Sequence, residues 1–376
     1  MIEALIAFAA MLALAFARMP IAFAMGLVGF AGFAFKTSVP AALAMAGAVT
    51  YETGLSYALS IVPLFVLMGN LVTRAGLSEQ LYDASHAFLG HRRGGLAMAT
   101  IVACGGFSAI CGSSIATAAT MAKVAVPPMR RFGYSDALAS GSVAAGGTLG
   151  ILIPPSIVMV MYSVSTNTSV GALFMAGVIP GIMLAIMLGM TTWYRARSNN
   201  YPRMPKASWT ERLKALRESI WGLLLIIIVM GGIYTGMFTP TEAAAMSAVW
   251  AFICAVFIYK DLGMKDVPRV LLSSANMSAM LLYIITNAVL FSFLMTHENI
   301  PQAMADAMIG TGVGVIGFLL IANILLLAAG NFMEPSSIVL ILAPILFPIA
   351  IKLGIDPVHF GIIMVVNMEV GMCHPP

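Results

Sequence analysis

The sequence predicts an all-α polytopic membrane protein, built as an inverted repeat with two re-entrant helical hairpins. Composition is the first observation: of 376 residues, 60% are hydrophobic and 9% are charged, whereas about a quarter of a soluble domain is charged. The second is that apolar windows, each about long enough to cross a hydrocarbon core of roughly 30 Å as a helix, recur along the chain. The clearest windows are residues 2–17, 21–35, 220–238, 243–259 and 312–329. The third is a repeat of glycines and prolines between the two halves.

The chain lacks the motifs of an enzyme. It has no P-loop, no GxSxG and no HExxH sequence, and its four cysteines lie in apolar segments without CxxC spacing. Such cysteines are more often small buried hydrophobic residues than disulfides or metal ligands. The sequence therefore predicts no enzymatic activity, no cofactor, no resident metal ion and no nucleic-acid partner.

Basic residues set the expected orientation. Seven of the nineteen lie in the segment 195–217, which the positive-inside rule assigns to the cytoplasm. Counting crossings outward from this segment places sixteen of the nineteen inside and the N-terminus outside, provided that 94–127 enters and leaves the membrane on one side. Residues 208–217 are expected to form an amphipathic helix on the anionic membrane surface, which makes membrane lipid a partner.

The segment 94–127 is predicted to be the first hairpin. Its apolar stretches 94–109 and 113–126 would each form about 21–24 Å of helix, too short to span the membrane. Glycines and serines between them would form the tip, and Pro127-Pro128 are expected to end the second helix. The alternative is one ordinary helix with small residues at a packing face, but it would put the arginine pairs that flank the segment on opposite sides of the membrane.

Glycines and prolines of the two halves match at a shift of 221 residues. The matched positions are Pro127 and Pro348, Gly133 and Gly354, Gly150 and Gly371, and Pro154-Pro155 and Pro375-Pro376. The second half also carries a hairpin, predicted over 312–350 with a break at 331–335. An odd number of crossings joins the copies, so their topologies are inverted. Inverted repeats with paired broken helices are the architecture of secondary transporters.

Each hairpin is followed by an interrupted helix, predicted over 136–164 with its break in 146–156, and over 356–376 with its break in 367–376. Free carbonyls at such breaks suit a cation, and exposed helix N-termini suit an anion. Oxygens that can complete cation sites belong to Ser108, Ser113, Ser114 and Thr148 in the first half and to Asn331, Ser336, Ser337 and Asn367 in the second. No arginine lies at either tip, so helix dipoles, hydroxyl groups and bound cations would hold an anionic substrate. The candidate substrate-binding residues are Ser114, Pro154, Ser156, Ser336, Ser337 and Pro375.

Four stretches closely resemble the large membrane subunit of the TRAP (tripartite ATP-independent periplasmic) transporters, and the resemblance covers essentially the whole chain. They are GGFSAICGSSIATAATMAKVAVPPMRRFGY, AAGGTLGILIPPSIVMVMYSVSTNTSVGALFMAGVIPG, TPTEAAA and GIDPVHFGIIMVVNMEVGMCHPP. The final CHPP looks most like the C4-dicarboxylate branch. The resemblance implies an elevator-type transporter of the bacterial inner membrane that imports succinate, malate or fumarate by Na⁺ symport. It also implies two partners, a small four-helix membrane subunit and a periplasmic substrate-binding protein.

The resemblance also implies where Na⁺ binds. Carried over by motif, the family's sites fall near Ser108, Gly112, Ser113 and Gly147 in the first half, and near Gly330, Glu334 and the stretch from Asn367 to His374 in the second. Glu334 stands where many relatives have Asp. The chain stops at Pro376, although symmetry with the first copy predicts about 40 to 50 further residues, so we expect the sequence to be a fragment.

The expected organisation has five parts. They are scaffold helices with an interfacial arm over 1–91, a first transport repeat over 92–199, a basic cytoplasmic loop over 200–219, scaffold helices with a second arm over 220–310, and a second transport repeat over 311–376. The two arms are predicted at 77–89 and 300–309.

Four polar residues have other interpretations. Glu242, in the sequence TPTE, is expected to cap a helix start together with Thr239 rather than to contact substrate. Asp356 and His359 are also expected to be caps. Glu369 is ionisable within an apolar segment, where such groups are costly, so it is either a functional residue or one half of a pair at a scaffold contact.

Two other transporter classes fit the same pattern. A stand-alone Na⁺/dicarboxylate symporter would share the hairpins and need no binding protein. An ion antiporter of related architecture would not depend on a carboxylate substrate.

Overall fold

The computed structural model describes residues 2–373 apart from 200, 298, 300, 301, 304, 305, 307–309, 311, 313 and 332. The described part of the chain forms helices and turns and contains no β-strand. Six of its helical segments are long and apolar enough to cross a membrane: Asp136–Thr166, Val170–Ser198, Trp209–Tyr234, Pro240–Ile258, Val267–His297 and Pro335–Lys352. The predicted fold class, an all-α polytopic membrane protein, is confirmed.

The chain divides into two compact units, which we name after the hairpin that each contains. The first-hairpin unit comprises Ile61–Met159 and Val170–Ala275. The second-hairpin unit comprises Met1–Ser60, Val160–Ser169 and Asn276–Pro376.

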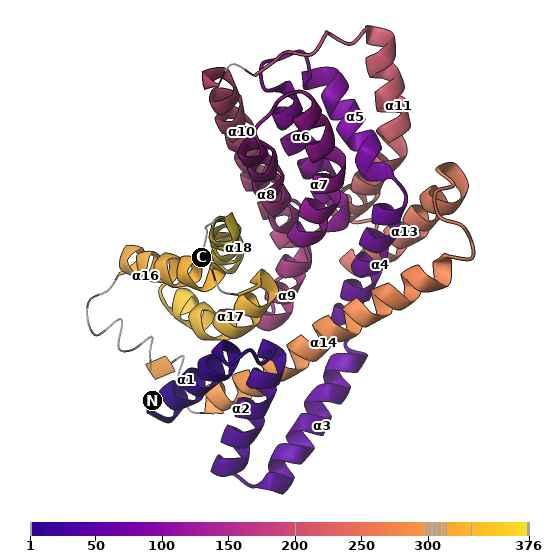
Figure 1. Cartoon of the computed structure of the whole chain (residues 1–376). Helices are drawn as coiled ribbons and strands as arrows, with labels where there is room; N and C mark the ends of the chain where they lie inside the picture. The colour runs from indigo at the N-terminus through magenta and orange to yellow at the C-terminus, as the bar shows by residue number, and fades with distance from the viewer. Residues whose placement is uncertain are drawn as a thin grey trace. The chain divides into compact units, whose positions relative to one another are not determined.

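The first-hairpin unit is built around three helices that pack together in Figure 1: α6 (Gly95–Cys111), α7 (Ser114–Arg131) and α8 (Asp136–Leu152). Its other helices are α4 (Ile61–Arg74), α5 (Leu77–Leu89), α10 (Val170–Ser198), α11 (Trp209–Ile226), α12 (Gly232–Tyr234) and α13 (Pro240–Ile253). The Thr100 hydroxyl of α6 donates a 3.6 Å hydrogen bond to the Met129 sulfur of α7. Residues on opposite sides of the Gly112 turn therefore meet, so α6 and α7 form a hairpin, and the alternative of one ordinary helix is wrong.

The second-hairpin unit holds the corresponding three helices, α16 (Val315–Gly330), α17 (Pro335–Lys352) and α18 (Pro357–Cys373), which also lie together in Figure 1. It further contains α1 (Ile2–Phe16), α2 (Ile21–Lys36), α3 (Val39–Leu55), most of α9 (Ile157–Thr166) and the second part of α14 (Val267–His297).

Helix bounds confirm the internal repeat. Both ends of α7 and α17, and the starts of α8 and α18, differ by the 221 residues that the glycines and prolines predicted. The helix caps repeat as well. Gly133 and Gly354 have left-handed φ angles of 75° and 80°, and each follows a helix whose last carbonyls accept the same pair of backbone hydrogen bonds. Glycine adopts this conformation without steric cost, which explains its presence at both positions.

The prediction that Pro127-Pro128 end the second helix of the hairpin is wrong. α7 continues through both prolines to Arg131, and α17 likewise continues through Pro344 and Pro348. Proline fits the φ angle of a helix, and neighbouring elements can satisfy the carbonyls that it leaves unpaired. The second arm of each hairpin is therefore longer than predicted.

The predicted interruptions are shorter than expected. In the first half, the glycine-rich residues 146–152 remain helical, and only 153–156 separate α8 from α9. In the second half, α18 is continuous through Asn367 to Cys373. His374 and the two final prolines lie outside the described residues.

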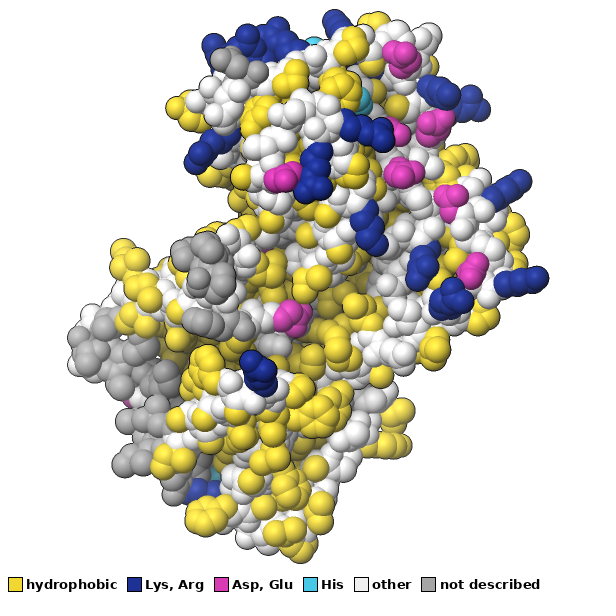
Figure 2. All heavy atoms as spheres, in the orientation of Figure 1, with side chains coloured by type: hydrophobic (Ala, Val, Ile, Leu, Met, Phe, Trp, Pro, Cys, Tyr) yellow, Lys and Arg dark blue, Asp and Glu magenta, His cyan; other side chains and the backbone are white. Residues whose placement is uncertain are grey.

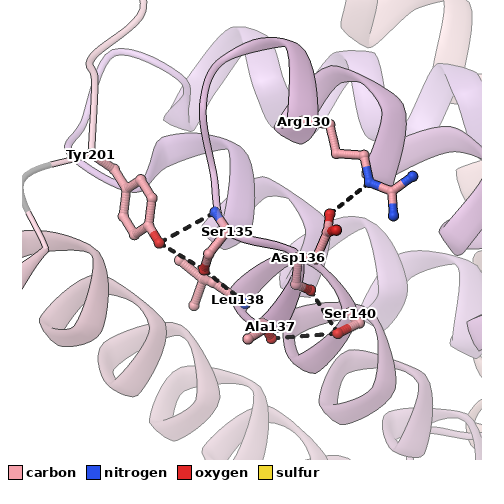
Figure 3. A network of polar contacts seen from close by, with 7 residues as sticks. All are labelled: Arg130, Ser135, Asp136, Ala137, Leu138, Ser140 and Tyr201. Atoms are coloured by element: carbon pink, nitrogen blue, oxygen red, sulfur yellow. Dashed lines mark hydrogen bonds and ion pairs between the residues drawn. The ribbon is translucent and has the colours of Figure 1, made fainter.

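A polar network fixes the turn between α7 and α8 (Figure 3). The Ser135 hydroxyl caps α8 by accepting from the Leu138 amide at 3.3 Å, and the Tyr201 hydroxyl donates to the same oxygen at 2.8 Å. Arg130 Nε donates to Asp136 Oδ1 at 2.6 Å, although an exposed pair of this kind contributes only about 0–1 kcal/mol. The turn is thus tied to the chain segment that follows α10.

Positive charge gathers on the first-hairpin unit. Figure 2 shows Lys and Arg side chains around α5, α10 and α11 and their loops, which include the basic segment 195–217. Residues 77–89, the predicted first arm, form helix α5; their role as an interfacial arm stays a prediction. The predicted arm 300–309 falls mostly outside the described residues. α11 begins at Trp209 and runs on as one helical segment to Tyr234, so the basic amphipathic stretch is the start of an apolar helix rather than a separate one.

Candidate functional site

The tip of the first hairpin is a tight turn that requires glycine at its centre. Gly112 has a left-handed φ of 66°, and its amide donates to the Ser108 carbonyl at 3.0 Å. A Cβ at this position would lie 2.7 Å from the Pro155 carbonyl oxygen, so only glycine lets the tip reach the α8–α9 break. Ser113 then starts α7 as its N-cap, accepting from the Ala116 amide at 3.5 Å.

Glycines on α8 allow that helix to lie against the hairpin backbone. A Cβ on Gly150 would stand 2.8 Å from the Ser113 carbonyl carbon, and one on Gly147 would stand 2.8 Å from the Ala118 Cβ. Such distances are shorter than normal carbon–carbon contacts. The glycine face therefore brings α8 close to the start of α7. Gly147 and Ser113, which the family resemblance places near the same Na⁺ site, lie on these two elements.

The break between α8 and α9 is closed by one serine. The Ser156 hydroxyl donates to the Ile151 carbonyl at 2.6 Å and accepts from the Met159 amide at 3.3 Å. It therefore satisfies a carbonyl freed at the end of α8 and caps the start of α9. The Pro154–Pro155 peptide bond within this break is cis.

Two hydroxyl oxygens near the first tip, Ser108 Oγ and Thr117 Oγ1, are buried without a hydrogen-bond partner among the described residues. Ser108 is fully buried in α6, and its Oγ has no hydrogen-bond partner among the described residues. Thr148, by contrast, donates to the Ala145 carbonyl of its own helix at 2.8 Å, so its hydroxyl can only accept or bind a cation through its remaining lone pairs. An oxygen such as Ser108 Oγ is costly to bury unless something binds it.

The tip of the second hairpin is more polar than the first. Glu334 stands at the repeat position of Ser113 and is the residue before α17, but its side chain makes no capping bond. Instead, Glu334 Oε1 accepts from the buried Ser336 hydroxyl at 2.7 Å. The Glu334 carbonyl accepts from the amide of Ser337, which is also buried, at 3.0 Å. The Asn331 Oδ1 atom is buried without a partner in the described part of the chain.

Two glycines set the distance between α16 and α18. A Cβ on Gly330 would stand 2.9 Å from the Gly371 Cα, so the two backbones touch. Next to this contact, the Asn367 amide nitrogen donates to Asn323 Oδ1 across the helices, and also to the Ile363 carbonyl at 2.8 Å. The predicted cation residues Gly330 and Asn367 thus belong to one helix–helix contact.

The carboxyl group of Glu369 is buried and has no partner in the described part of the chain. The residue is 1% exposed, and both of its carboxyl oxygens lack a hydrogen bond from any residue that the structure describes. The 221-residue shift relates Glu369 to Thr148, another predicted cation residue. A carboxyl group buried in an apolar helix marks a functional candidate.

The predicted residues therefore fall into two groups, one in each unit. Ser108, Gly112, Ser113 and Gly147 meet around the first tip, and Gly330, Asn331, Glu334 and Asn367 lie around the second tip and the α16–α18 contact. The candidates His374 and Pro375 lie outside the described residues. Sequence reasoning missed Asn323, although a lone amide inside the apolar helix VIGFLLIANILLLAAG is a visible signal.

The chain has several apolar spans and two helical hairpins, and the helix that follows each hairpin starts at a position related by the repeat. Together these features define a membrane transport protein. The chain belongs to the family described as tripartite ATP-independent periplasmic transporter, DctM component, which matches residues 8–376. It is therefore a transporter permease subunit that takes part in import, and it is not an enzyme.

Relatives of this family are close in sequence. The chain is 55% identical to the C4-dicarboxylate TRAP transporter large permease protein of Rhodobacter capsulatus, over 100% of this chain and 88% of the relative. It is 51% identical to the protein of the same name from Pseudomonas aeruginosa, over 87% and 76% of the two chains.

The fold also has a relative of known structure. The Alcanivorax borkumensis YdaH transporter superposes with a TM-score of 0.59 at 15% identity, covering 84% of this chain and 73% of the other. At this identity the likeness concerns the fold alone.

Proposed function

We propose that this chain is the large permease of a Na⁺-driven system that imports C4-dicarboxylates such as succinate, malate or fumarate across the bacterial inner membrane. It works with a small four-helix membrane subunit and a periplasmic binding protein that delivers the substrate. An elevator-type movement carries the substrate and Na⁺ across.

The observation that carries this proposal is the repeated hairpin-and-helix unit, in which α7 and α8 reappear as α17 and α18 at a constant shift. Paired elements of this kind are the architecture of secondary transporters, in which the substrate binds at the repeats. The name shared by the two relatives supports a C4-dicarboxylate as that substrate.

The oxygen atoms at the two tips support Na⁺ as the coupling ion. Ser108 Oγ and Asn331 Oδ1 are buried without hydrogen-bond partners among the described residues, and neutral oxygens of this kind suit a hard cation. No Lys or Arg lies in the tip stretches 108–118 or 329–337. The dicarboxylate would therefore be held by helix N-termini and serine hydroxyls, with bound Na⁺ offsetting its charge. Ser114, Ser336 and Ser337 are the proposed hydroxyl donors, and Pro154, Ser156 and Pro375 are the other proposed substrate-binding residues.

The test is uptake of labelled succinate into proteoliposomes that hold the large and small subunits. Uptake is measured with and without the binding protein, and with and without an inward Na⁺ gradient. We expect uptake only when both are present. A K⁺ gradient of equal size, with the same membrane potential, is the control for the ion.

Other outcomes separate the alternatives. Uptake that needs Na⁺ but no binding protein would assign the chain to the stand-alone symporters. If the binding protein docks but no C4-dicarboxylate is transported, the assignment to a tripartite system stands and the proposed substrate is wrong.

A further inference from the structure

We propose that Asn323 is a positioning residue for the second-half cation site. It holds the Asn367 amide so that Asn367 Oδ1 faces away from α16 as a Na⁺ ligand. This inference rests on the Na⁺ coupling proposed above and assigns a role to a residue that no motif of the sequence points to.

Hydrogen bonds on both amides determine which way each side chain faces. The Asn323 nitrogen donates to the Leu319 carbonyl at 2.7 Å, which leaves Asn323 Oδ1 as the atom that faces α18. The Asn367 nitrogen donates to that oxygen and to the Ile363 carbonyl. Amide orientations are assigned from such networks, and turning either amide over would bring two oxygens together. The network therefore permits one orientation of each side chain.

The orientation leaves one acceptor atom unused. The oxygen and nitrogen of an amide point to opposite sides of the side chain, so Asn367 Oδ1 is directed away from Asn323. No residue that the structure describes donates a hydrogen bond to it. Asn367 is 8% exposed, and a carbonyl oxygen of a largely buried side chain that receives no hydrogen bond from the protein is available to a cation.

Close packing of the two helices makes the contact between the amides possible. Gly371 follows Asn367 by one helical turn, and a Cβ on Gly371 would lie 3.5 Å from the Leu327 carbonyl oxygen, one turn after Asn323. The helices therefore run in the same direction here, with backbones in contact beside the asparagine pair. Buried Leu326 and Met364 fill the same faces, so the pair is held in place on both helices.

The chemical consequence is specific to a cation. With the Asn323 oxygen in place, Asn367 presents a carbonyl oxygen, which binds Na⁺. Without it, only the Ile363 carbonyl holds the Asn367 nitrogen, so the orientation that presents the oxygen loses one of its two acceptors, and the turned amide would present N–H groups, which repel a cation. Removing Asn323 should therefore weaken Na⁺ binding more than it changes the transport step itself.

The experiment measures the Na⁺ dependence of succinate uptake by the complete three-component system, at saturating binding protein and substrate. We expect Asn323→Ala to raise the half-saturating Na⁺ concentration about tenfold, while the rate at saturating Na⁺ stays within about twofold. Asn323→Asp retains an acceptor for the Asn367 nitrogen and should restore Na⁺ dependence close to that of the unmodified protein. If Asn323→Ala does not reach the membrane, Asn323→Leu replaces it, because leucine has a similar volume and no acceptor. It should raise the half-saturating Na⁺ concentration in the same way.

The matched control is Asn287→Ala. Asn287 is an amide of the second-hairpin unit, buried where Asn323 is half-buried, and its nitrogen likewise donates to a carbonyl of its own helix, that of Tyr283, at 2.8 Å. It should leave the half-saturating Na⁺ concentration unchanged. Equal effects of the two alanine variants would show that Asn323 has only a structural role. So would a lower rate at every Na⁺ concentration with an unchanged half-saturating concentration.

The outcomes also separate this inference from the coupling proposal. If the unmodified protein transports succinate without Na⁺, both are overturned. If its transport depends on Na⁺ and Asn323→Ala has no effect, this inference alone is overturned.

Discussion

Glu242 shows how far a single residue can be understood from its neighbours. The Thr239 amide donates to Glu242 Oε2 at 2.8 Å, and the Glu242 amide donates to the Thr239 hydroxyl at 3.3 Å. Together with Pro240 in the first turn, this completes the predicted capping box of α13. The predicted cap at Asp356 is also confirmed, because its Oδ1 accepts from the amides of Val358 and His359 at 2.9 Å.

Because its carboxylate is engaged by the cap, Glu242 should matter for stability and not for substrate. Glu242→Ala is expected to lower the thermal stability of the protein through the lost capping box and to leave the apparent KM for succinate unchanged. Thermal unfolding in detergent and uptake kinetics check the two parts. Glu242→Gln, which retains an acceptor oxygen, is the control. A raised KM in a variant of unchanged thermal stability would show that Glu242 contacts the substrate.

At the scale of elements, glycine contacts decide how the helices of each hairpin unit pack. Gly147 and Gly150 bring α8 against α7, and Gly330 and Gly371 bring α16 against α18. The sequence shows these glycines as a repeat, but their partners follow only from the packed structure. The two units use the related positions Gly150 and Gly371 differently, since Gly150 meets the hairpin tip and Gly371 meets the end of α16.

Two glycines of α8 allow a matched test. Gly150→Ala places a Cβ 2.8 Å from the backbone of Ser113, so the tip must shift, at a cost of about 1–3 kcal/mol. We expect about a tenfold loss of succinate uptake at equal amounts of protein in the membrane. Gly141→Ala, on an exposed face of the same helix with no atom within 4 Å, should retain uptake and raise stability slightly. Equal uptake by the two variants would mean that the tip tolerates displacement.

At the scale of the whole molecule, charge distribution and the repeat determine the expected topology. Sixteen of nineteen basic residues fall on one side in the predicted arrangement. The hairpin shape of α6 and α7, shown by the contact of Thr100 with Met129, is the element on which this count depends. An even number of passages through 94–127 returns the chain to the side from which it entered.

Cysteine accessibility tests this topology directly. In a variant without the four native cysteines, Thr37→Cys should react with a membrane-impermeant maleimide in intact cells, because residue 37 is expected outside. Arg203→Cys, in the basic segment after α10, should react only after the membrane is permeabilised. Both positions are exposed, so protection at either one reports the membrane and not burial. The reverse pattern would invert the orientation.

The sequence by itself determined the class of the protein and the ends of several helices. Apolar composition requires a membrane, and caps such as Thr239 and Gly133 act on groups within about four residues, so they can be read locally. The same local signals misplaced the end of α7, because prolines that stop a helix in water can be accommodated in a packed membrane helix. Only the tertiary structure decided the partners of Gly112, Gly150 and Asn323. Asn323 meets a residue 44 positions away, and such contacts depend on how whole helices pack, which no local pattern contains.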